Sequence, residues 1–329
     1  MFRVFCLFWL AWTLTERAAF ADDLAELPLT KQTALRFATP EEGREAITKR
    51  DTFTEHLSKF DLQCRLKTAD AVRLEDLLKL YADNVTAWPA EEVAAVTKAA
   101  EFVREQLEPF TIAQPKTILL IRTTGREEAG AAYCRGPAIV LPANMIEQDG
   151  PALRRLLAHE LFHVISTQNP ELRRDLYAII GFRMCTPIEL PAVLKDRALT
   201  NPDAPQIDAY IELKLADGEK LLAAPILLAS ADQYDAKSGK TLFHYLQFRL
   251  MQVEQHGDKW RAVLKDGQPP LIDPRGLASY SQQIGQNTGY IIHPDEILAD
   301  NFAHLIMKTE NLRSPEIIEK LRERLTKQP

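Results

Sequence analysis

Apolar positions recur at helical spacing through the first third of the chain. In residues 90–107, valines and alanines stand three to four positions apart, which is the period of one helix face. The same criterion predicts a helix over 41–65, with two helices separated by a break near Asp61 as the alternative, and another helix over 74–82. We therefore expect a helix-rich N-terminal region over residues 22–110, led by a stretch (22–40) without a clear pattern.

After residue 110 the pattern shifts toward short apolar runs and strict alternation, both of which are typical of strands. Five segments fit: 117–122, 138–141, 208–215, 221–228 and 243–253. The last three are separated by turn signals such as Asp217-Gly218, and they predict a β-rich insert over about residues 205–265. Residues 111–329 are thus expected to form a second region that contains this insert.

Two long helices are predicted on either side of the insert. Residues 152–168 contain no Pro or Gly, follow Pro151, which suits a first helical turn, and precede the stop signal Asn169-Pro170. The second helix begins at Pro294. Its apolar stripe consists of Ile297, Leu298, Phe302, Leu305 and Ile306.

The first 21 residues read as a signal peptide. Arg3 precedes an apolar run over residues 4–14, and Ala19-Phe20-Ala21 has the small-x-small form of a cleavage site. We expect an exported protein, periplasmic or extracellular, without a stable membrane span after cleavage, because the apolar run is too short to cross a bilayer comfortably. An uncleaved membrane anchor is the alternative.

Composition restricts the partners. The chain has 329 residues, a formal net charge of −6 and 46% hydrophobic residues, which suits a globular protein but not a nucleic-acid or anionic-membrane binder. Cys64, Cys134 and Cys185 remain after signal cleavage, so at most one disulfide can form within the chain.

The chemically most specific stretch is His159-Glu160-Leu161-Phe162-His163, which spells H-E-x-x-H inside the first long helix. Residues four apart lie on one helix face, so His159 and His163 can bind one Zn²⁺ together. Glu160 can reach a water at the metal without binding the metal itself, and can then act as general base.

A catalytic zinc site needs a third protein ligand and one open position. Glu296 and Asp300 stand one turn apart on the second long helix, so Glu296 is the predicted ligand and Asp300 the partner of a ligand histidine. Two other pairs have the same spacing. They are Glu171 with Asp175, next to two arginines, and Glu254 with Asp258, in a turn-like stretch.

His159-Glu160-x-x-His163 followed by Glu296-x-x-x-Asp300 resembles the gluzincin branch of zinc metallopeptidases, of which thermolysin is a member. The resemblance covers these two short segments, and the separation between them is longer than in thermolysin. It implies one zinc per chain bound by His159, His163 and Glu296, with Glu160 as base and Asp300 supporting a ligand histidine. It also implies an α+β, zincin-like fold with a helix-rich N-terminal part and a small sheet over the active-site helix.

The resemblance further implies a strand beside the active helix that pairs with the substrate backbone, at 138–141 or at Ala132-Tyr133. An oxyanion stabiliser is also needed. Tyr290 is our choice for it, with Tyr280, His293 and His304 in the same neighbourhood.

The sequence therefore predicts an exported zinc metallopeptidase acting on a peptide or protein substrate, most simply a metalloendopeptidase. An exported zinc-binding protein that uses a zincin-like scaffold for interaction without hydrolysis is the alternative. A binding module without metal is a third reading, in which the motif is accidental.

Overall fold

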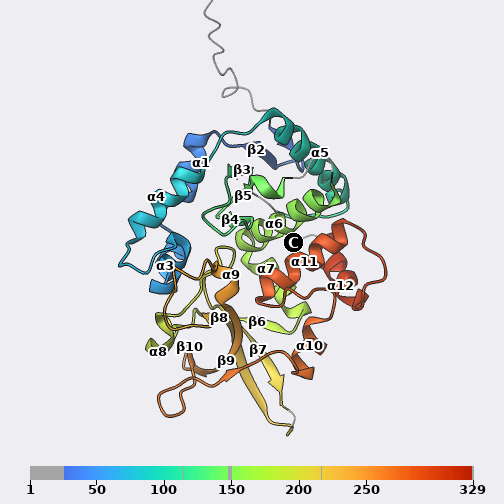
Figure 1. The fold of residues 1–329 in the computed structure, drawn as a ribbon. Helices are drawn as coiled ribbons and strands as arrows, with labels where there is room; N and C mark the ends of the chain where they lie inside the picture. Colours follow the sequence, from blue (N-terminus) through green and yellow to red (C-terminus); the bar gives the residue numbers. More distant parts are fainter. Residues whose placement is uncertain (1–25, 114, 147–149, 216, 328–329) are drawn as a thin grey trace, which may run out of the picture.

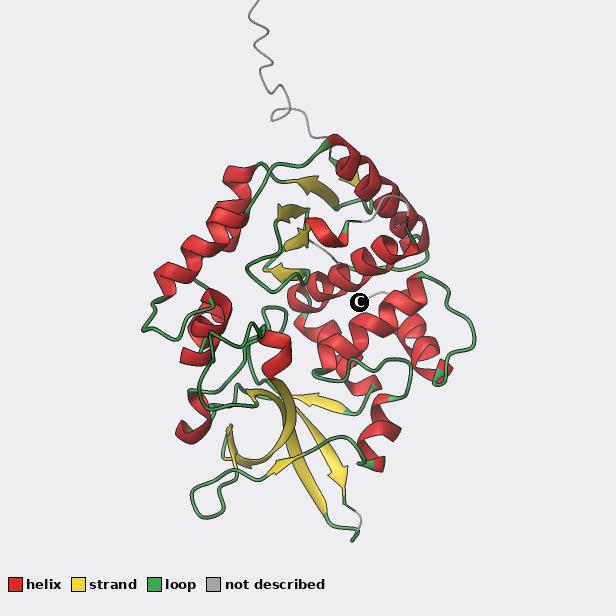
Figure 2. Ribbon diagram, viewed as in Figure 1, coloured by secondary structure: helices red, strands yellow, loops and turns green. Residues whose placement is uncertain are grey.

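The computed structural model describes residues 26–113, 115–146, 150–215 and 217–327. The protein belongs to the α+β class, with two sheets and a group of helices between and around them (Figures 1 and 2). The predicted signal peptide, residues 1–21, lies outside the described residues. No helix in the described ranges is long and apolar enough to cross a membrane.

The first sheet combines strands from both predicted regions. Its order is β1-β2-β3-β5-β4, with β2, β3 and β5 parallel to one another and with antiparallel strands at both edges. The strands are β1 (Leu27–Pro28), β2 (Ala34–Phe37), β3 (Thr117–Thr123), β4 (Tyr133–Arg135) and β5 (Ala138–Pro142). Residues 27–37, which lie in the stretch without a clear sequence pattern, thus join the sheet of the second region.

Helices cover both faces of this sheet because its strands alternate between two apolar clusters. In β3, Ile118 and Leu120 face one cluster, and Ile121 faces the other. The first cluster packs against α5 (Ala90–Leu107) and α6 (Pro151–Gln168), and the second against α1 (Pro40–Ile47) and α4 (Leu74–Asn84). The predicted helices at 74–82, 90–107 and 152–168 are confirmed.

The segment predicted as one helix over 41–65, or as two with a break near Asp61, is divided into three helices. These helices are α1, α2 (Thr52–His56) and α3 (Lys59–Leu66). The breaks fall before Asp61, where Asp51 and Ser58 each accept a hydrogen bond from a backbone amide three residues later. Such capping side chains start a new helix and end the previous one, because the capping residue itself is extended.

The strands predicted over about residues 205–265 are present, and they form an antiparallel sheet that also takes in β6 before this range and β11 after it. The order is β10-β9-β8-β7-β6, and β11 pairs with β9. Its strands are β6 (Phe182–Met184), β7 (Ala209–Lys214), β8 (Lys220–Ala229), β9 (Leu246–His256), β10 (Lys259–Ala262) and β11 (Leu271–Ile272). The short helices are α8 (Ala192–Lys195), α9 (Leu242–Tyr245), α10 (Ala278–Ile284) and the 3-10 turn η1 (Ala143–Met145).

The second predicted long helix is confirmed as α11 (Pro294–Ile306), and it packs directly along α6. Phe162 and Phe302 meet in this contact with ring centroids 5.6 Å apart. The helices α7 (Pro170–Ile179) and α12 (Pro315–Thr326) pack beside them. Since both apolar stripes are buried between α6 and α11, the polar residues at one end of the contact are brought face to face.

Candidate metal centre

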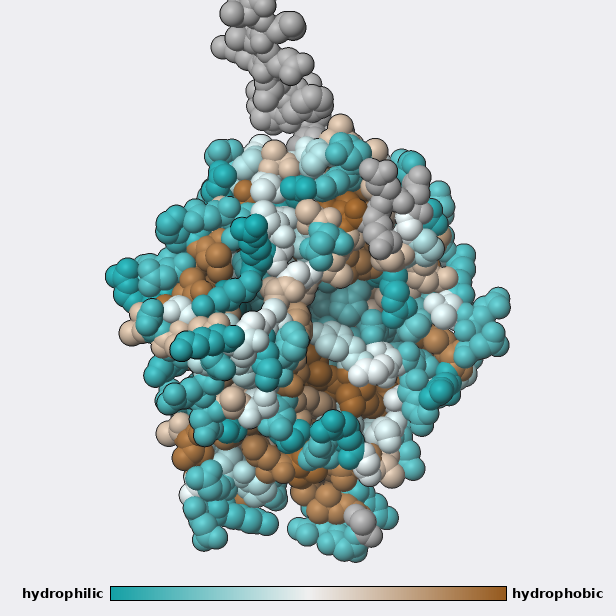
Figure 3. All heavy atoms as spheres, in the orientation of Figure 1, coloured by the Kyte–Doolittle hydropathy of each residue, from teal (hydrophilic) through white to brown (hydrophobic). Residues whose placement is uncertain are grey.

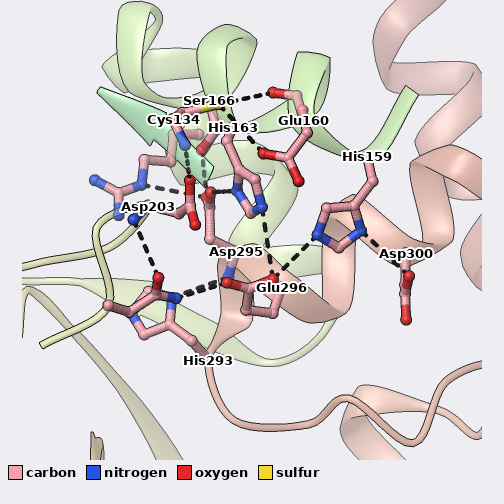
Figure 4. Close-up of polar contacts among 12 residues, drawn as sticks. Cys134, His159, Glu160, His163, Ser166, Asp203, His293, Asp295, Glu296 and Asp300 are labelled. Carbon is pink, nitrogen blue, oxygen red and sulfur yellow. Dashed lines mark hydrogen bonds and ion pairs between the residues drawn. The ribbon is translucent and has the colours of Figure 1, made fainter. Parts of the chain in front are cut away.

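The paired helices α6 and α11 place three possible ligands together. His159 Nε2 lies 3.2 Å from Glu296 Oε2, and His163 Nε2 lies 3.5 Å from the same oxygen. One donor atom from each residue falls within 4.8 Å of the other two. Figure 4 shows the three side chains turned toward one another. Two ligands bound to zinc at 2.0–2.1 Å in tetrahedral geometry stand about 3.3 Å apart, so the spacing suits a zinc ion.

One buried nitrogen in this group makes no hydrogen bond. His163 Nε2 has no hydrogen-bond partner in the described structure, although the side chain is only 1% exposed. A buried polar atom left unpaired is unfavourable, and such an atom calls for an explanation, a missing ion among them. Two imidazoles and one carboxylate form a donor set that catalytic zinc sites use. The residues therefore fit the ion that the sequence predicts.

The other ring nitrogen of each histidine is held by an aspartate. His159 Nδ1 lies 3.2 Å from Asp300 Oδ1, where the sequence placed a supporting carboxylate. His163 Nδ1 lies 2.7 Å from Asp295 Oδ2. Because each Nδ1 is occupied, each ring presents Nε2 toward Glu296, which is how carboxylates orient histidine ligands in metal sites.

Asp295 was not singled out in the sequence because an acid in the first turn of a helix has an ordinary explanation in the helix dipole. It is fully buried and also accepts hydrogen bonds from Ser166 and from the Tyr177 hydroxyl, the latter at 2.9 Å. Burial opposes its ionisation, but the hydrogen bond and the charge of His163, with Arg173 nearby, lower the pKa of Asp295.

Asn201 is a second residue that the sequence did not reveal. Its Nδ2 donates to Glu296 Oε1 at 2.6 Å, which leaves Oε2 directed at the two histidines. Asn201 lies in a proline-rich stretch that reads as a linker, 95 residues before its partner, so no local pattern points to the contact.

Glu160 is buried beside the three possible ligands but does not belong to them. Its carboxylate lies 3.5 Å from the Cys134 thiol, and the carboxylate of Asp203 belongs to the same group of atoms within 4.8 Å. Burial raises the pKa of Glu160, although the charges of His159 and His163 oppose this. A raised pKa brings a carboxylate closer to the range in which a general base works near neutral pH.

The carboxylates around the site change the pKa values of both histidines. Burial opposes protonation of His163, but the carboxylates of Asp203 and Glu296 and the hydrogen bond to Asp295 raise its pKa well above the ordinary value. Burial likewise opposes protonation of His159, and the hydrogen bonds to Asp300 and Glu296 raise its pKa to about 9. The carboxylates around these two rings thus favour a positive charge at this place.

The competing acidic pairs lie elsewhere. Glu171 and Asp175 are exposed on α7, and Asp175 pairs with Arg324 at 2.7 Å. Glu254 lies in β9 and pairs with Arg261 at 2.8 Å.

Of the residues considered for oxyanion stabilisation, Tyr290 is the one that lines a cavity together with Asp203 and Asn201, and it is 40% exposed. Tyr280 is buried and donates to the Ile291 carbonyl at 2.9 Å. His293 caps α11 by accepting from the Asp295 amide at 3.2 Å. His304 contacts Arg155 and the Asn287 carbonyl. All three residues are thus engaged in contacts within the protein.

Figure 3 shows a hollow near the middle of this face of the molecule, between its upper part and its lower, β-rich part. Of the two segments considered for substrate pairing, residues 138–141 lie in β5, which has neighbours on both sides and so cannot add a strand. Ala132-Tyr133 lies at the start of β4, on the edge of the sheet.

No protein-family model matches this chain, and no curated protein or solved structure shows significant similarity to it.

Proposed function

We propose that the protein is a zinc-dependent metallopeptidase with a zincin-like arrangement, in which His159, His163 and Glu296 hold one zinc ion. The observation that carries the proposal is the buried His163 Nε2, which makes no hydrogen bond among the described residues and is directed, like His159 Nε2, at Glu296, while both Nδ1 atoms are held by aspartates. The resemblance to gluzincins supports the same residues independently of their positions in space.

Zinc bound there would polarise a scissile carbonyl and lower the pKa of a water molecule. Glu160 would take a proton from the attacking water and deliver it to the leaving amine. Asp300 and Asp295 would keep the two imidazoles in the required tautomer and orientation. Asn201 would hold one oxygen of Glu296, so that only the other faces the histidines.

Tyr290 is the residue we propose to donate a hydrogen bond to the developing oxyanion. It lies in the same cavity as Asp203 and Asn201, and 40% of its surface remains open to a ligand. A tyrosine hydroxyl can assist a metal in this way because it donates only where the negative charge develops.

The test is the zinc content of the wild type and of Glu296→Ala, measured side by side by elemental analysis after dialysis against a weak chelator. We expect about one zinc per chain in the wild type and clear loss in the variant. Glu254→Ala is the matched control, because it removes an exposed glutamate far from the site. Equal zinc in all three proteins would place the third ligand elsewhere, and a wild type that binds no zinc after reconstitution would end the proposal.

Hydrolysis of a peptide mixture by the zinc-loaded wild type, followed by mass spectrometry, separates an enzyme from the alternative function. A protein that holds zinc at these residues and cleaves no peptide would fit an exported zinc-binding interaction protein instead.

A further inference from the structure

The outward edge of β4 is closed at one position by a side chain. β4 pairs with β5 along one edge only, and its other edge is free of strands in the described part of the chain. The Cys134 amide donates to Asp203 Oδ1 at 2.6 Å along this second edge, so it points away from β5. Peptide groups of a strand alternate in direction, so those of Ala132, two residues earlier, face the same way as those of Cys134. Ala132 lines a cavity of about 50 Å³ together with Tyr290 and Asp203. An extended peptide could therefore pair with Ala132 but would meet the Asp203 carboxylate at Cys134.

Asp203 is held firmly in that place. It belongs to the turn 201–204, in which the Asp203 amide donates to Asn201 Oδ1 at 3.1 Å and the Ala204 amide donates to the Asn201 carbonyl at 3.2 Å. Asn201 is in turn bonded to Glu296. Just before the turn, the Thr200 hydroxyl donates to Asp61 at 2.8 Å, and the Thr200 carbonyl accepts from Arg65 at 2.9 Å. The carboxylate is thus a fixed part of the site rather than the tip of a loose loop.

The Asp203 carboxylate distinguishes between the amino and the carboxyl end of a peptide substrate. Burial and the carboxylates of Glu160 and Glu296 raise the pKa of Asp203, although the charge of His163 opposes this. An ammonium group placed against Asp203 would favour its ionised form, whereas the carboxyl terminus of a peptide would add a further negative charge and be repelled. Asp203 also lies within 4.8 Å of Glu160 through their closest oxygens, so a group bound to it is adjacent to the reacting bond.

We propose that Asp203 binds the free α-amino group of a peptide and that the enzyme removes the first residue from the amino terminus. This inference rests on the proposed function, and it replaces the simpler endopeptidase expectation with an aminopeptidase. The water oxygen bonds to the first carbonyl carbon, the C–N bond breaks, and Glu160 carries the proton of the water to the leaving nitrogen. The side chain of the first residue enters the adjacent cavity, whose apolar wall includes Leu242, Phe243 and Leu246.

The first experiment measures binding without turnover. Zinc-loaded Glu160→Gln is titrated by calorimetry with the tripeptide amide Leu-Ala-Ala and with its N-acetylated form. We expect the free amine to bind at least tenfold more tightly, because a hydrogen bond between two charged groups is among the stronger polar contacts. Adding Asp203→Asn, which keeps an oxygen for the Cys134 amide but removes the charge, should abolish that preference. Asp258→Asn, in an exposed turn, is the control and should leave it unchanged.

The second experiment measures kinetics in proteins with intact Glu160. Asp203→Asn should raise KM for the free tripeptide at least tenfold and change kcat less, since the lost contact is made in the ground state as well. Equal binding of free and acetylated peptide by Glu160→Gln would overturn the inference. So would faster cleavage of acetylated peptides by Asp203→Asn, which would make the turn a barrier to longer substrates. In both cases zinc binding and cleavage by the wild type would still support a metallopeptidase, whereas a wild type without zinc or cleavage would reject both proposals.

Discussion

The cluster around Arg65 and the cluster around His163 are buried to the same degree, but they differ in how their polar atoms are satisfied. Arg65, Asp61 and Glu128 have side chains between 0% and 4% exposed, and the Arg65 guanidinium bonds to both carboxylates and to the Thr200 carbonyl. His163 and Glu296 are 1% and 3% exposed, yet His163 Nε2 has no hydrogen-bond partner. Burial and charge are therefore shared by both clusters. What points to chemistry in the second is that the atom without a hydrogen bond belongs to a group of two imidazoles and one carboxylate, a donor set that suits zinc.

The largest effect is expected on peptide hydrolysis, from a substitution beside the His163 cluster. Glu160→Gln should lower peptide hydrolysis by 10²- to 10⁴-fold, the usual contribution of a general base, because the amide cannot accept a proton from water. Zinc content should stay at the wild-type level, since Glu160 lies outside the three-ligand group. Elemental analysis and a peptide assay on the same preparation provide both values. Full activity in a preparation free of other proteases would remove Glu160 from its role.

The second largest effect is expected on the stability of the fold, from a substitution in the Arg65 cluster. Arg65→Met should lower the free energy of unfolding by about 3–5 kcal/mol, because it leaves two buried carboxylates without their cation. Urea unfolding followed by circular dichroism measures the change. Arg50→Met is the control, since its pair with Glu75 is exposed to solvent and should contribute little to stability. Zinc per folded chain should be unchanged in both variants, and a loss of zinc in Arg65→Met would show that this cluster also shapes the metal site through Thr200.

The sequence predicted the second cluster far better than the first. The H-E-x-x-H spacing and the apolar stripes of α6 and α11 are local patterns, and burying these stripes against each other brings Glu296 to His159. The bounds of α5 were predicted to the residue for the same reason.

Contacts that depend on irregular segments could not be predicted. Asn201 and Asp203 lie in a turn whose sequence reads as a linker, and their partners are Glu296 and Cys134, 95 and 69 residues away. Asp295 looked like an ordinary acid at a helix start, although its position one residue before Glu296 places it against His163. Single-chain periodicity carries no information on such pairs, because neither partner needs a local pattern to reach the other.

A moderate effect on zinc affinity is expected from the two aspartates that contact the Nδ1 atoms of His159 and His163. Asp295→Asn should weaken zinc binding by about 10- to 100-fold, the usual loss when such a supporting carboxylate is removed. Asp300→Asn should have the smaller effect of the two, because Asp300 is 17% exposed and water can replace it, whereas Asp295 is 1% exposed. Competition with a chromogenic chelator gives both affinities. The reverse order would mean that His159 depends on its aspartate more than His163 does.

The smallest effect concerns the glutamates that share the E-x-x-x-D spacing but lie away from α6. Glu171→Gln and Glu254→Gln should leave zinc content and hydrolysis at the wild-type level, since Glu171 is exposed and Glu254 pairs with Arg261 on the surface of β9. Stability should change by less than about 1 kcal/mol in each, as is usual for exposed ion pairs and surface charges. Parallel measurements with Glu296→Gln make the null result meaningful, because all three variants carry the same chemical change. Loss of zinc in either surface variant would mean that the third ligand is Glu171 or Glu254, and that the contact between α6 and α11 does not identify it.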